Sequence, residues 1–252
     1  MVGLLYQLMF CGSLYDNAPT LATVDSAVLS DVGQFAPIIG AYAVLEQGGY
    51  STFDKETIGN SVLTYGSTYN FGQQVGWDNN LIFMYSLYDI NGDSVPELIF
   101  GVKIVNENIY LSGIYALQNN NPVSIIEVES RSYLHVITDI EGNVVISHAR
   151  GRMDYAQDAY YQIDQNGKLV TLDILNTNGF DWSKANPDNP EEAPPYIRTK
   201  EINGQEIIIS EDEYSTLIKK YGTSGYGLSN GDDWVAAERP INLNWKPILS
   251  SK

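Results

Sequence analysis

The chain has 252 residues, of which 31 are acidic and 14 are basic, so its formal net charge is −17 at pH 7. This acidic excess disfavours binding to nucleic acids and to anionic lipid surfaces, and it attracts cations. Aromatic residues reach 12% and charged residues only 18%, which is typical of packed, strand-rich globular proteins and not of acidic disordered tails. The single cysteine, Cys11, excludes an intrachain disulfide.

Residues 1–13 form an apolar stretch with small residues at its end, similar to the last part of a signal segment. Within it, Leu8-Met9-Phe10-Cys11 resembles a bacterial lipobox, whose cysteine carries a lipid anchor, although Phe10 is bulkier than that motif prefers. The alternative is that residues 4–14 form a buried helix with Cys11 in the core. Elsewhere the sequence has no apolar stretch of membrane-spanning length, so we expect no transmembrane segment.

Apolar residues recur at steps of three and four over residues 30–47, which predicts a helix buried on one face. Gly48 is expected to end this helix. Pro37 lies inside the run and is tolerated in a first turn, so an alternative start lies nearer Ala36. The Gly-, Ser-, Thr- and Asn-rich stretch that follows predicts a loop with one short helix over 54–63.

After Asn80 the sequence changes to short β-prone runs separated by turn signals at spacings of about ten residues. This spacing favours consecutive antiparallel strands. The predicted strands cover residues 81–88, 98–104, 109–117, 124–128, 133–138, 144–149, 159–163 and 169–175.

Two hairpin turns are predicted, at residues 139–143 and 164–168, because each begins with aspartate and places glycine where the loop needs a positive φ. Four prolines within residues 186–195 prevent regular strand pairing there. We therefore expect that stretch to form an exposed loop or linker.

Residues 202–207 are typical of a tight hairpin with Asn-Gly at its turn. Ser210 and Glu213 have the capping-box spacing, which predicts a helix over 211–221.

Together these elements predict an α+β fold, in which an N-terminal helical segment packs on a mainly antiparallel β-sheet of about six to eight strands, with a late C-terminal helix. Three regions are expected within one domain. They are the N-terminal helical segment 1–80, the antiparallel sheet with a metal-binding loop 81–185, and the proline-rich loop, hairpin, helix and tail 186–252.

The loop from Asp89 to Glu97 carries the clearest chemical signal in the sequence. Asp89, Asn91 and Asp93 alternate, so their side-chain oxygens can converge on the centre of a tight loop. Val95 can add its main-chain carbonyl and Glu97 its carboxylate, which gives the hard oxygen ligands that Ca²⁺ prefers. The sequence therefore predicts a calcium site between two strands. The alternative is an Asx-rich hairpin turn in which Glu97 is simply solvated.

The same residues resemble a known motif. Residues 85–99, Tyr-Ser-Leu-Tyr-Asp-Ile-Asn-Gly-Asp-Ser-Val-Pro-Glu-Leu-Ile, resemble the aspartate-rich motif, ending in Pro-Glu-Leu, of uncharacterised secreted proteins and lipoproteins of Gram-positive bacteria. They are also similar to the calcium loops of integrin-type β-propeller repeats and, more distantly, of EF-hands and dockerins. The resemblance implies a calcium-stabilised extracellular domain, secreted or at the cell surface, without an established activity.

The sequence departs from an EF-hand at two positions, because Ser94 replaces the glycine at loop position 6 and Phe100 the glutamate at position 12. We therefore expect a strand-loop-strand site with the modest affinity of extracellular modules, with a dissociation constant of about 10⁻⁴ to 10⁻³ M.

Other candidate sites are less specific. His135 and His148 lie on strands joined by a short hairpin and could face each other, but no third ligand has zinc spacing. The pairs Glu127 with Glu129 and Asp154 with Asp158 are candidate glycosidase carboxylates, although 31 acidic residues produce many chance pairs.

The sequence favours a non-enzymatic binding or structural role, with calcium and either a carbohydrate or a surface protein as partners. The alternative is a secreted hydrolase acting on glycans or peptidoglycan. Several aromatic residues could stack on sugars or fill a tyrosine-rich core, namely Tyr155, Tyr160, Tyr161, Trp182 and Trp234.

Overall fold

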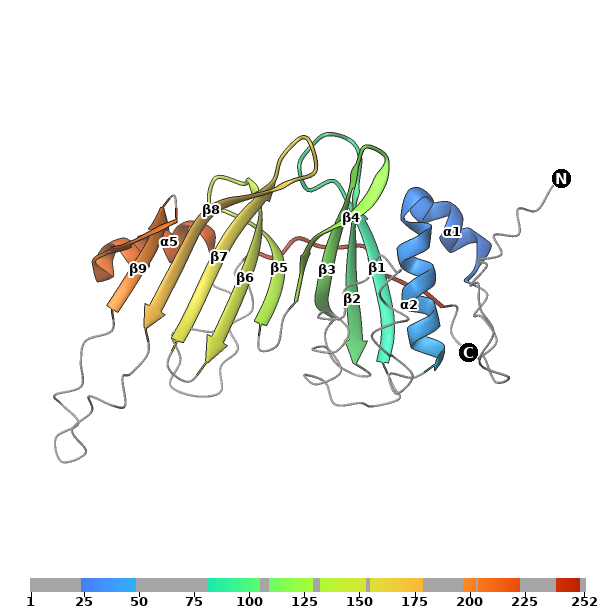
Figure 1. Ribbon diagram of the computed structural model, residues 1–252, viewed down its shortest axis with the longest axis horizontal. Helices are drawn as coiled ribbons and strands as arrows, with labels where there is room; N and C mark the ends of the chain where they lie inside the picture. Colours follow the sequence, from blue (N-terminus) through green and yellow to red (C-terminus); the bar gives the residue numbers. More distant parts are fainter. Residues whose placement is uncertain are drawn as a thin grey trace, which may run out of the picture.

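The computed structural model describes residues 24–48, 81–104, 109–128, 132–152, 155–178, 197–202, 204–222 and 239–249. Within these residues, two helices, two antiparallel sheets and a further helix follow one another across the molecule (Figure 1). This is the predicted α+β class. The predictions for residues 1–13 with Cys11, for the helix over 54–63 and for the proline-rich stretch 186–195 lie outside the described residues.

The N-terminal helical segment begins with α1, capped by the side chain of Asp25, which accepts a hydrogen bond of 2.8 Å from the main-chain N–H of Ala27. Gly33 has a φ of 53°, which ends α1. Pro37 lies in the first turn of α2, so the alternative helix start near Ala36 is confirmed. The three helical elements are α1 (Ser26–Val32), the 3₁₀ turn η1 (Gly33–Phe35) and α2 (Ala36–Gly48).

All eight predicted strands are present, most of them longer by a few residues than predicted. The strands are β1 (Leu81–Tyr88), β2 (Glu97–Ile104), β3 (Ile109–Gln118), β4 (Asn121–Glu127), β5 (Ser132–Thr138), β6 (Val144–Arg152), β7 (Tyr155–Ile163), β8 (Leu169–Asn178), β9 (Ile197–Ile202), β10 (Gln205–Ile208) and β11 (Lys246–Pro247).

The prediction of one sheet with six to eight strands is wrong, because these strands form two sheets. One has five strands in the order β11-β1-β2-β3-β4, and the other has six in the order β10-β9-β8-β7-β6-β5. The physical reason is that β2 is apolar on both faces, so one face packs on the helices and the other on a second sheet. Leu98 and Phe100 face the N-terminal helices, whereas Ile99 faces the second sheet. The unbroken apolar run Leu-Ile-Phe is typical of such a strand.

Three apolar clusters hold these layers together. Tyr42 of α2 stacks on Phe100 at a ring-centroid distance of 3.5 Å between the N-terminal helices and the five-stranded sheet. Ile99 and Ile146 belong to the cluster between the two sheets. The third cluster joins the six-stranded sheet to the late helix α5 (Glu211–Tyr221), through Tyr160 and other residues. Tyr160 is fully buried, so it belongs to the tyrosine-rich core and not to a sugar-binding surface.

The late helix has the predicted boundaries. The Oγ of Ser210 accepts a hydrogen bond of 3.1 Å from the main-chain N–H of Glu213, as the capping box requires, and Gly222 ends the helix with a φ of 90°. Before it, β9 and β10 form the predicted hairpin, with a φ of 75° at Gly204.

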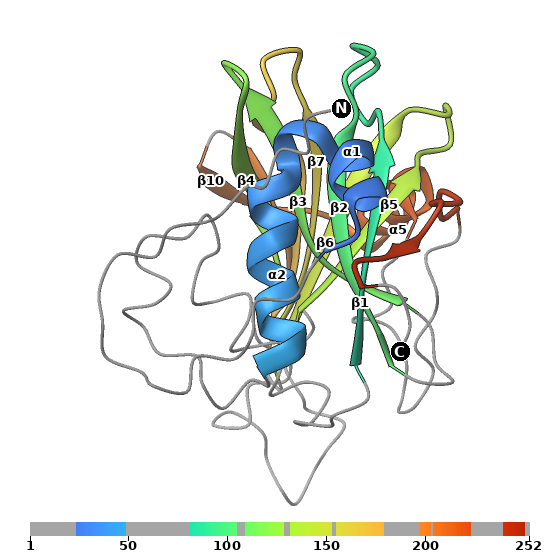
Figure 2. The same cartoon turned by 90° about the vertical axis from the view of Figure 1, so that its right-hand side faces the viewer.

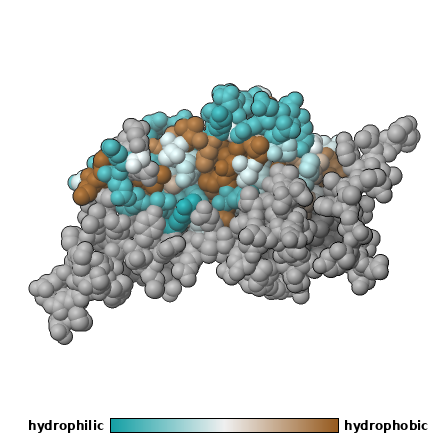
Figure 3. Space-filling view, viewed as in Figure 1, coloured by the Kyte–Doolittle hydropathy of each residue, from teal (hydrophilic) through white to brown (hydrophobic). Residues whose placement is uncertain are grey.

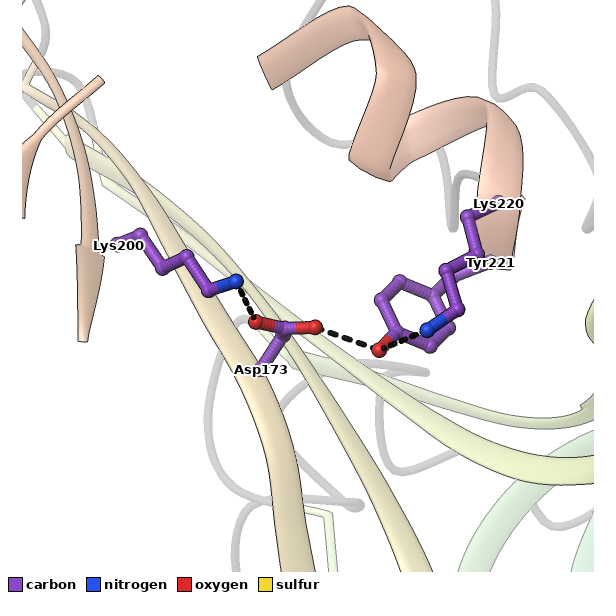
Figure 4. A network of polar contacts seen from close by, with 4 residues as sticks. All are labelled: Asp173, Lys200, Lys220 and Tyr221. Carbon is purple, nitrogen blue, oxygen red and sulfur yellow. Dashed lines mark hydrogen bonds and ion pairs between the residues drawn. The ribbon is translucent and has the colours of Figure 1, made fainter. Parts of the chain in front are cut away.

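A polar network fastens the end of α5 to the sheet (Figure 4). Tyr221 donates a hydrogen bond of 2.5 Å to one oxygen of the Asp173 carboxylate, and the ammonium of Lys200 lies 2.7 Å from the other. Lys220 donates to the Tyr221 hydroxyl at 3.2 Å. Lys200 thus compensates the negative charge of Asp173, and Tyr221 donates a hydrogen bond to it. A buried carboxylate needs partners of both kinds.

The segment 239–249 runs along both sheets. Thr138 of β5 donates its main-chain N–H to the carbonyl of Arg239 at 3.0 Å. Further on, Trp245 packs on Gly101, where an added Cβ would lie only 2.8 Å from its ring, and β11 then pairs with β1. One stretch of chain therefore lies against the edge strand β5 of one sheet and supplies the edge strand β11 of the other.

Candidate metal centre

The predicted calcium loop joins β1 to β2, and it begins where Tyr88 pairs with Glu97. Ile90 lies within the loop and is buried in the cluster between the sheets, so it anchors the loop to the core. Gly92 and Ser94 have φ values of 74° and 70°. A positive φ is ordinary for glycine but costs free energy at serine, so the surrounding contacts must hold this backbone in place.

The carboxylate of Asp89 lies inside the loop. Its Oδ1 accepts hydrogen bonds from the main-chain N–H groups of Gly92 at 2.7 Å and Asp93 at 3.1 Å. Its Oδ2 accepts a third from Ser94 at 2.9 Å. The loop backbone is therefore wound around one carboxylate.

Asn91 and Asp93 also turn inward. The Oδ1 of Asn91 accepts from the main-chain N–H of Asp93 at 3.0 Å, and the Oδ1 of Asp93 accepts from that of Val95 at 2.7 Å. The Nδ2 of Asn91 donates to the Oδ2 of Asp93 at 3.1 Å. Val95, predicted as a main-chain ligand, exposes its side chain.

Glu97 closes the loop from the first position of β2, and only 3% of its surface is exposed. Its Oε2 accepts a hydrogen bond of 2.8 Å from the main-chain N–H of Ile90. Burial raises the pKa of Glu97 to about 7, the hydrogen bond from Ile90 opposes this rise, and the nearby carboxylates of Asp93 and Asp89 add to it. Glu97 is therefore not a solvated residue at a turn.

The loop differs from the two ordinary aspartate turns of the same chain. In the turn 139–143, one oxygen of Asp139 accepts from the main-chain N–H groups of Glu141 at 2.8 Å and Asn143 at 2.9 Å, and Gly142 has the expected positive φ. The turn 164–168 repeats this pattern. In both turns the second oxygen of the aspartate accepts only from an asparagine side chain. Both oxygens of Asp89 instead accept from main-chain N–H groups, three in all. An ordinary Asx hairpin turn therefore does not describe the loop.

In this structure the three loop carboxylates are held by main-chain N–H groups and are not gathered at one point. Across the described part of the chain, no three His, Cys, Asp or Glu side chains are close enough to hold a metal ion by themselves. The predicted ligand set also includes an amide, at Asn91, and a main-chain carbonyl, at Val95. Its carboxylates would have to move closer together to surround an ion.

The neighbouring hairpin supports the loop from outside. The Nδ2 of Asn91 donates to the main-chain carbonyl of Asp164 at 3.0 Å, and the Nε2 of Gln165 donates to the main-chain carbonyl of Asn91 at 2.9 Å. On the other side of this hairpin, Gln118 donates to the carbonyl of Gly167 at 2.7 Å. Hydrophilic side chains gather at this end of the molecule (Figure 3). Gln165 could not be predicted from the sequence, because no local pattern links two residues that lie 74 positions apart.

The possibility that His135 and His148 face each other is excluded. Because β5 and β6 pair Leu134 with His148 and His135 with Ser147, the two histidines lie on opposite faces of the sheet. His148 is buried, and burial together with the charge of Arg150 lowers its pKa to about 4. The two histidines therefore cannot share a ligand.

The candidate carboxylate pairs are each only half described, because Glu129 and Asp154 lie outside the described residues. Glu127 accepts hydrogen bonds from the hydroxyls of Tyr115 at 3.1 Å and Ser124 at 2.9 Å. Asp158 is buried on β7.

No known family matches the chain, and neither does any curated protein or any solved structure. Among the described helices, none is both long and apolar enough to cross a membrane.

Proposed function

We propose that the loop from Asp89 to Glu97 binds Ca²⁺ and that the ion stabilises the fold. The observation that carries this proposal is the burial of Glu97 beside Asp89 and Asp93. Placing a buried carboxylate near two others costs free energy unless a positive charge compensates. None of the ion pairs among the described residues involves these three side chains. A divalent cation would supply the missing charge.

The ligands would be the side chains of Asp89, Asn91, Asp93 and Glu97 with the main-chain carbonyl of Val95, and water would complete the shell. The role of the ion is structural, because ligands brought together by folding make metal binding part of the folding free energy. At a free calcium concentration ten times the dissociation constant, the gain is about 1.4 kcal/mol.

We further propose that the chain is an exported or cell-surface module with a non-enzymatic binding or structural role. The similarity of residues 85–99 to the motif of secreted proteins and lipoproteins supports this. The affinity expected for such a loop would suit the calcium-rich exterior of cells. In this proposal the protein binds a carbohydrate or a surface protein, and Cys11 is a candidate for lipid attachment.

The test compares thermal unfolding in excess calcium and in chelator, together with calorimetric titration by Ca²⁺. Wild type should melt about 4 °C higher in calcium at ten times the dissociation constant. The double variant Asp93→Asn with Glu97→Gln should lose this shift. In chelator it should be at least as stable as wild type, because each new amide oxygen can still accept the main-chain hydrogen bond while the repulsion between the carboxylates of Asp93 and Glu97 is removed.

Asp139→Asn is the matched control, because it neutralises an aspartate in an ordinary turn and should keep the full calcium shift. Equal melting of wild type in calcium and chelator, with no heat of binding, would overturn the calcium proposal. Retention of the shift in the double variant would place the ion elsewhere.

A further inference from the structure

The four edges of the two sheets are protected to very different degrees. An edge strand exposes unpaired N–H and C=O groups, which can accept another strand. At one edge, β11 has only two residues. At another, β5 is covered, because Thr138 donates to the carbonyl of Arg239 and Ile241 donates to that of Val136, both at 3.0 Å.

The remaining edges are β4 and β10. Strand β4 includes Pro122, which has no N–H to offer, and most of its side chains are partly buried. In β10, by contrast, every residue is exposed. Ile208 exposes 79% of its surface and Ile207 40%. Strand β10 lies at the margin of the fold (Figure 2), and β9 is its only partner among the described strands.

The side chains of β10 define what a complementary strand would carry. Glu206 and Ile208 are two residues apart, so they project from the same face of the strand, whereas Ile207 projects from the other. The carboxylate of Glu206 has one weak contact, at 3.4 Å from the Nδ2 of Asn176. A complementary strand would therefore place a basic and an aliphatic residue two positions apart.

A second copy of the chain suits this edge poorly. Each copy has a net charge of −17, so two copies repel one another. A strand of four residues also offers much less than the roughly 800 Å² per partner that a stable protein interface needs. An added peptide strand obtains its affinity from main-chain hydrogen bonds, and the acidic charge favours a basic one.

We propose that β10 is a docking edge for an extended, basic segment of a partner protein, which adds to the six-stranded sheet as a further strand. Lysine or arginine of this segment pairs with Glu206, and an aliphatic side chain covers Ile208. This proposal is independent of calcium.

The probe is a fluorescent synthetic peptide that repeats the sequence Lys-Thr-Val-Thr. Its binding to the full-length protein is measured by anisotropy, and hydrogen exchange reports which amides it protects. Protection is expected at residues 205–208. A peptide of the same charge with prolines in place of the threonines should bind much more weakly, because it cannot form a strand.

Glu206→Lys is the informative variant, and Glu141→Lys is its matched control. Both glutamates are exposed, each has one contact of 3.4 Å to an asparagine, and each substitution changes the net charge equally. Loss of one charge pair should weaken peptide binding about tenfold in Glu206→Lys. The control should bind almost as wild type does, and circular dichroism should show that both variants fold.

Three results would each overturn the proposal. The proline peptide could bind as well as the strand-forming peptide, which would mean that charge alone attracts it. Glu141→Lys could weaken binding as much as Glu206→Lys does. Sedimentation could show a dimer of the wild type that Glu206→Lys abolishes, in which case a second copy occupies the edge.

Discussion

The side chain of Gln165 donates a hydrogen bond of 2.9 Å to the main-chain carbonyl of Asn91, so a hairpin of one sheet holds the candidate calcium loop of the other. The return contact, from the Asn91 amide to the carbonyl of Asp164, fixes the direction of that amide. Residues that orient a ligand without touching the metal influence affinity strongly.

Gln165→Met should therefore weaken calcium binding about tenfold and destabilise the protein by about 1 kcal/mol, because a hydrogen bond that positions the loop is lost. Gln118→Met is the control, since Gln118 donates to the same hairpin at Gly167 without touching the loop. It should cost similar stability and leave the calcium affinity unchanged. Calorimetric titration of both variants checks this, and equal affinities would show that the hairpin does not position Asn91.

His148 should make the protein sensitive to mild acid. Burial and the neighbouring Arg150 lower the pKa of His148 from 6.5 to about 4 in the folded state, so the unfolded chain binds this proton more readily. The unfolding free energy keeps its full value above about pH 6.5, where the imidazole is neutral in both states. It falls by about 3 kcal/mol in total as the pH is lowered towards 4. Urea unfolding at several pH values measures this loss.

His148→Gln, which stays neutral, should flatten the dependence of unfolding free energy on pH in that window. Carboxylates that titrate over the same range affect both proteins equally, so the difference between the two curves isolates His148. Parallel curves would mean that His148 is protonated as easily in the folded protein as in the unfolded chain.

The hydrogen bond from Tyr221 to Asp173, which holds the end of α5 on the sheet, gives a third prediction. Tyr221→Phe removes the 2.5 Å hydrogen bond to Asp173 but keeps the ring stacked on Tyr160, whose centroid lies 4.2 Å away. The loss should be about 2 kcal/mol, because a hydrogen bond to a charged group is removed. Asp173→Asn should cost more, since it also leaves Lys200 without its carboxylate. Chemical denaturation checks the order, and a smaller loss for Asp173→Asn would contradict it.

Local patterns were sufficient for α2, α5 and the eight strands from β1 to β8, but not for α1 or β11. The boundaries of α5 follow from Ser210 and Gly222, and the hairpins follow from glycines that adopt positive φ, such as Gly142 and Gly167. The division into two sheets could not be predicted, because it depends on β4 and β5, which follow one another in the chain but do not pair. The relative orientation of His135 and His148 could not be predicted either, since a shift of one residue in register moves a side chain to the opposite face.

The candidate site shows the same limit. The sequence indicates which residues of the loop carry side-chain oxygens, and the structure places Asp89, Asn91 and Asp93 inside it. The burial of Glu97 and the support from Gln165 depend on how the loop packs in the folded protein, and no pattern within the loop predicts them. Whether the loop holds calcium stays a prediction.

The path of residues 239–249 sets a condition on how the protein matures. Arg239 binds Thr138, which leaves the ribosome 101 residues earlier, and β11 completes the sheet that β1 began. Until residues 239–249 emerge, the outer sides of β1 and β5 lack the backbone partners that these residues supply. Contacts between such distant residues also form slowly. A nascent chain of this protein should thus stay incompletely folded at least until residues 239–249 have emerged.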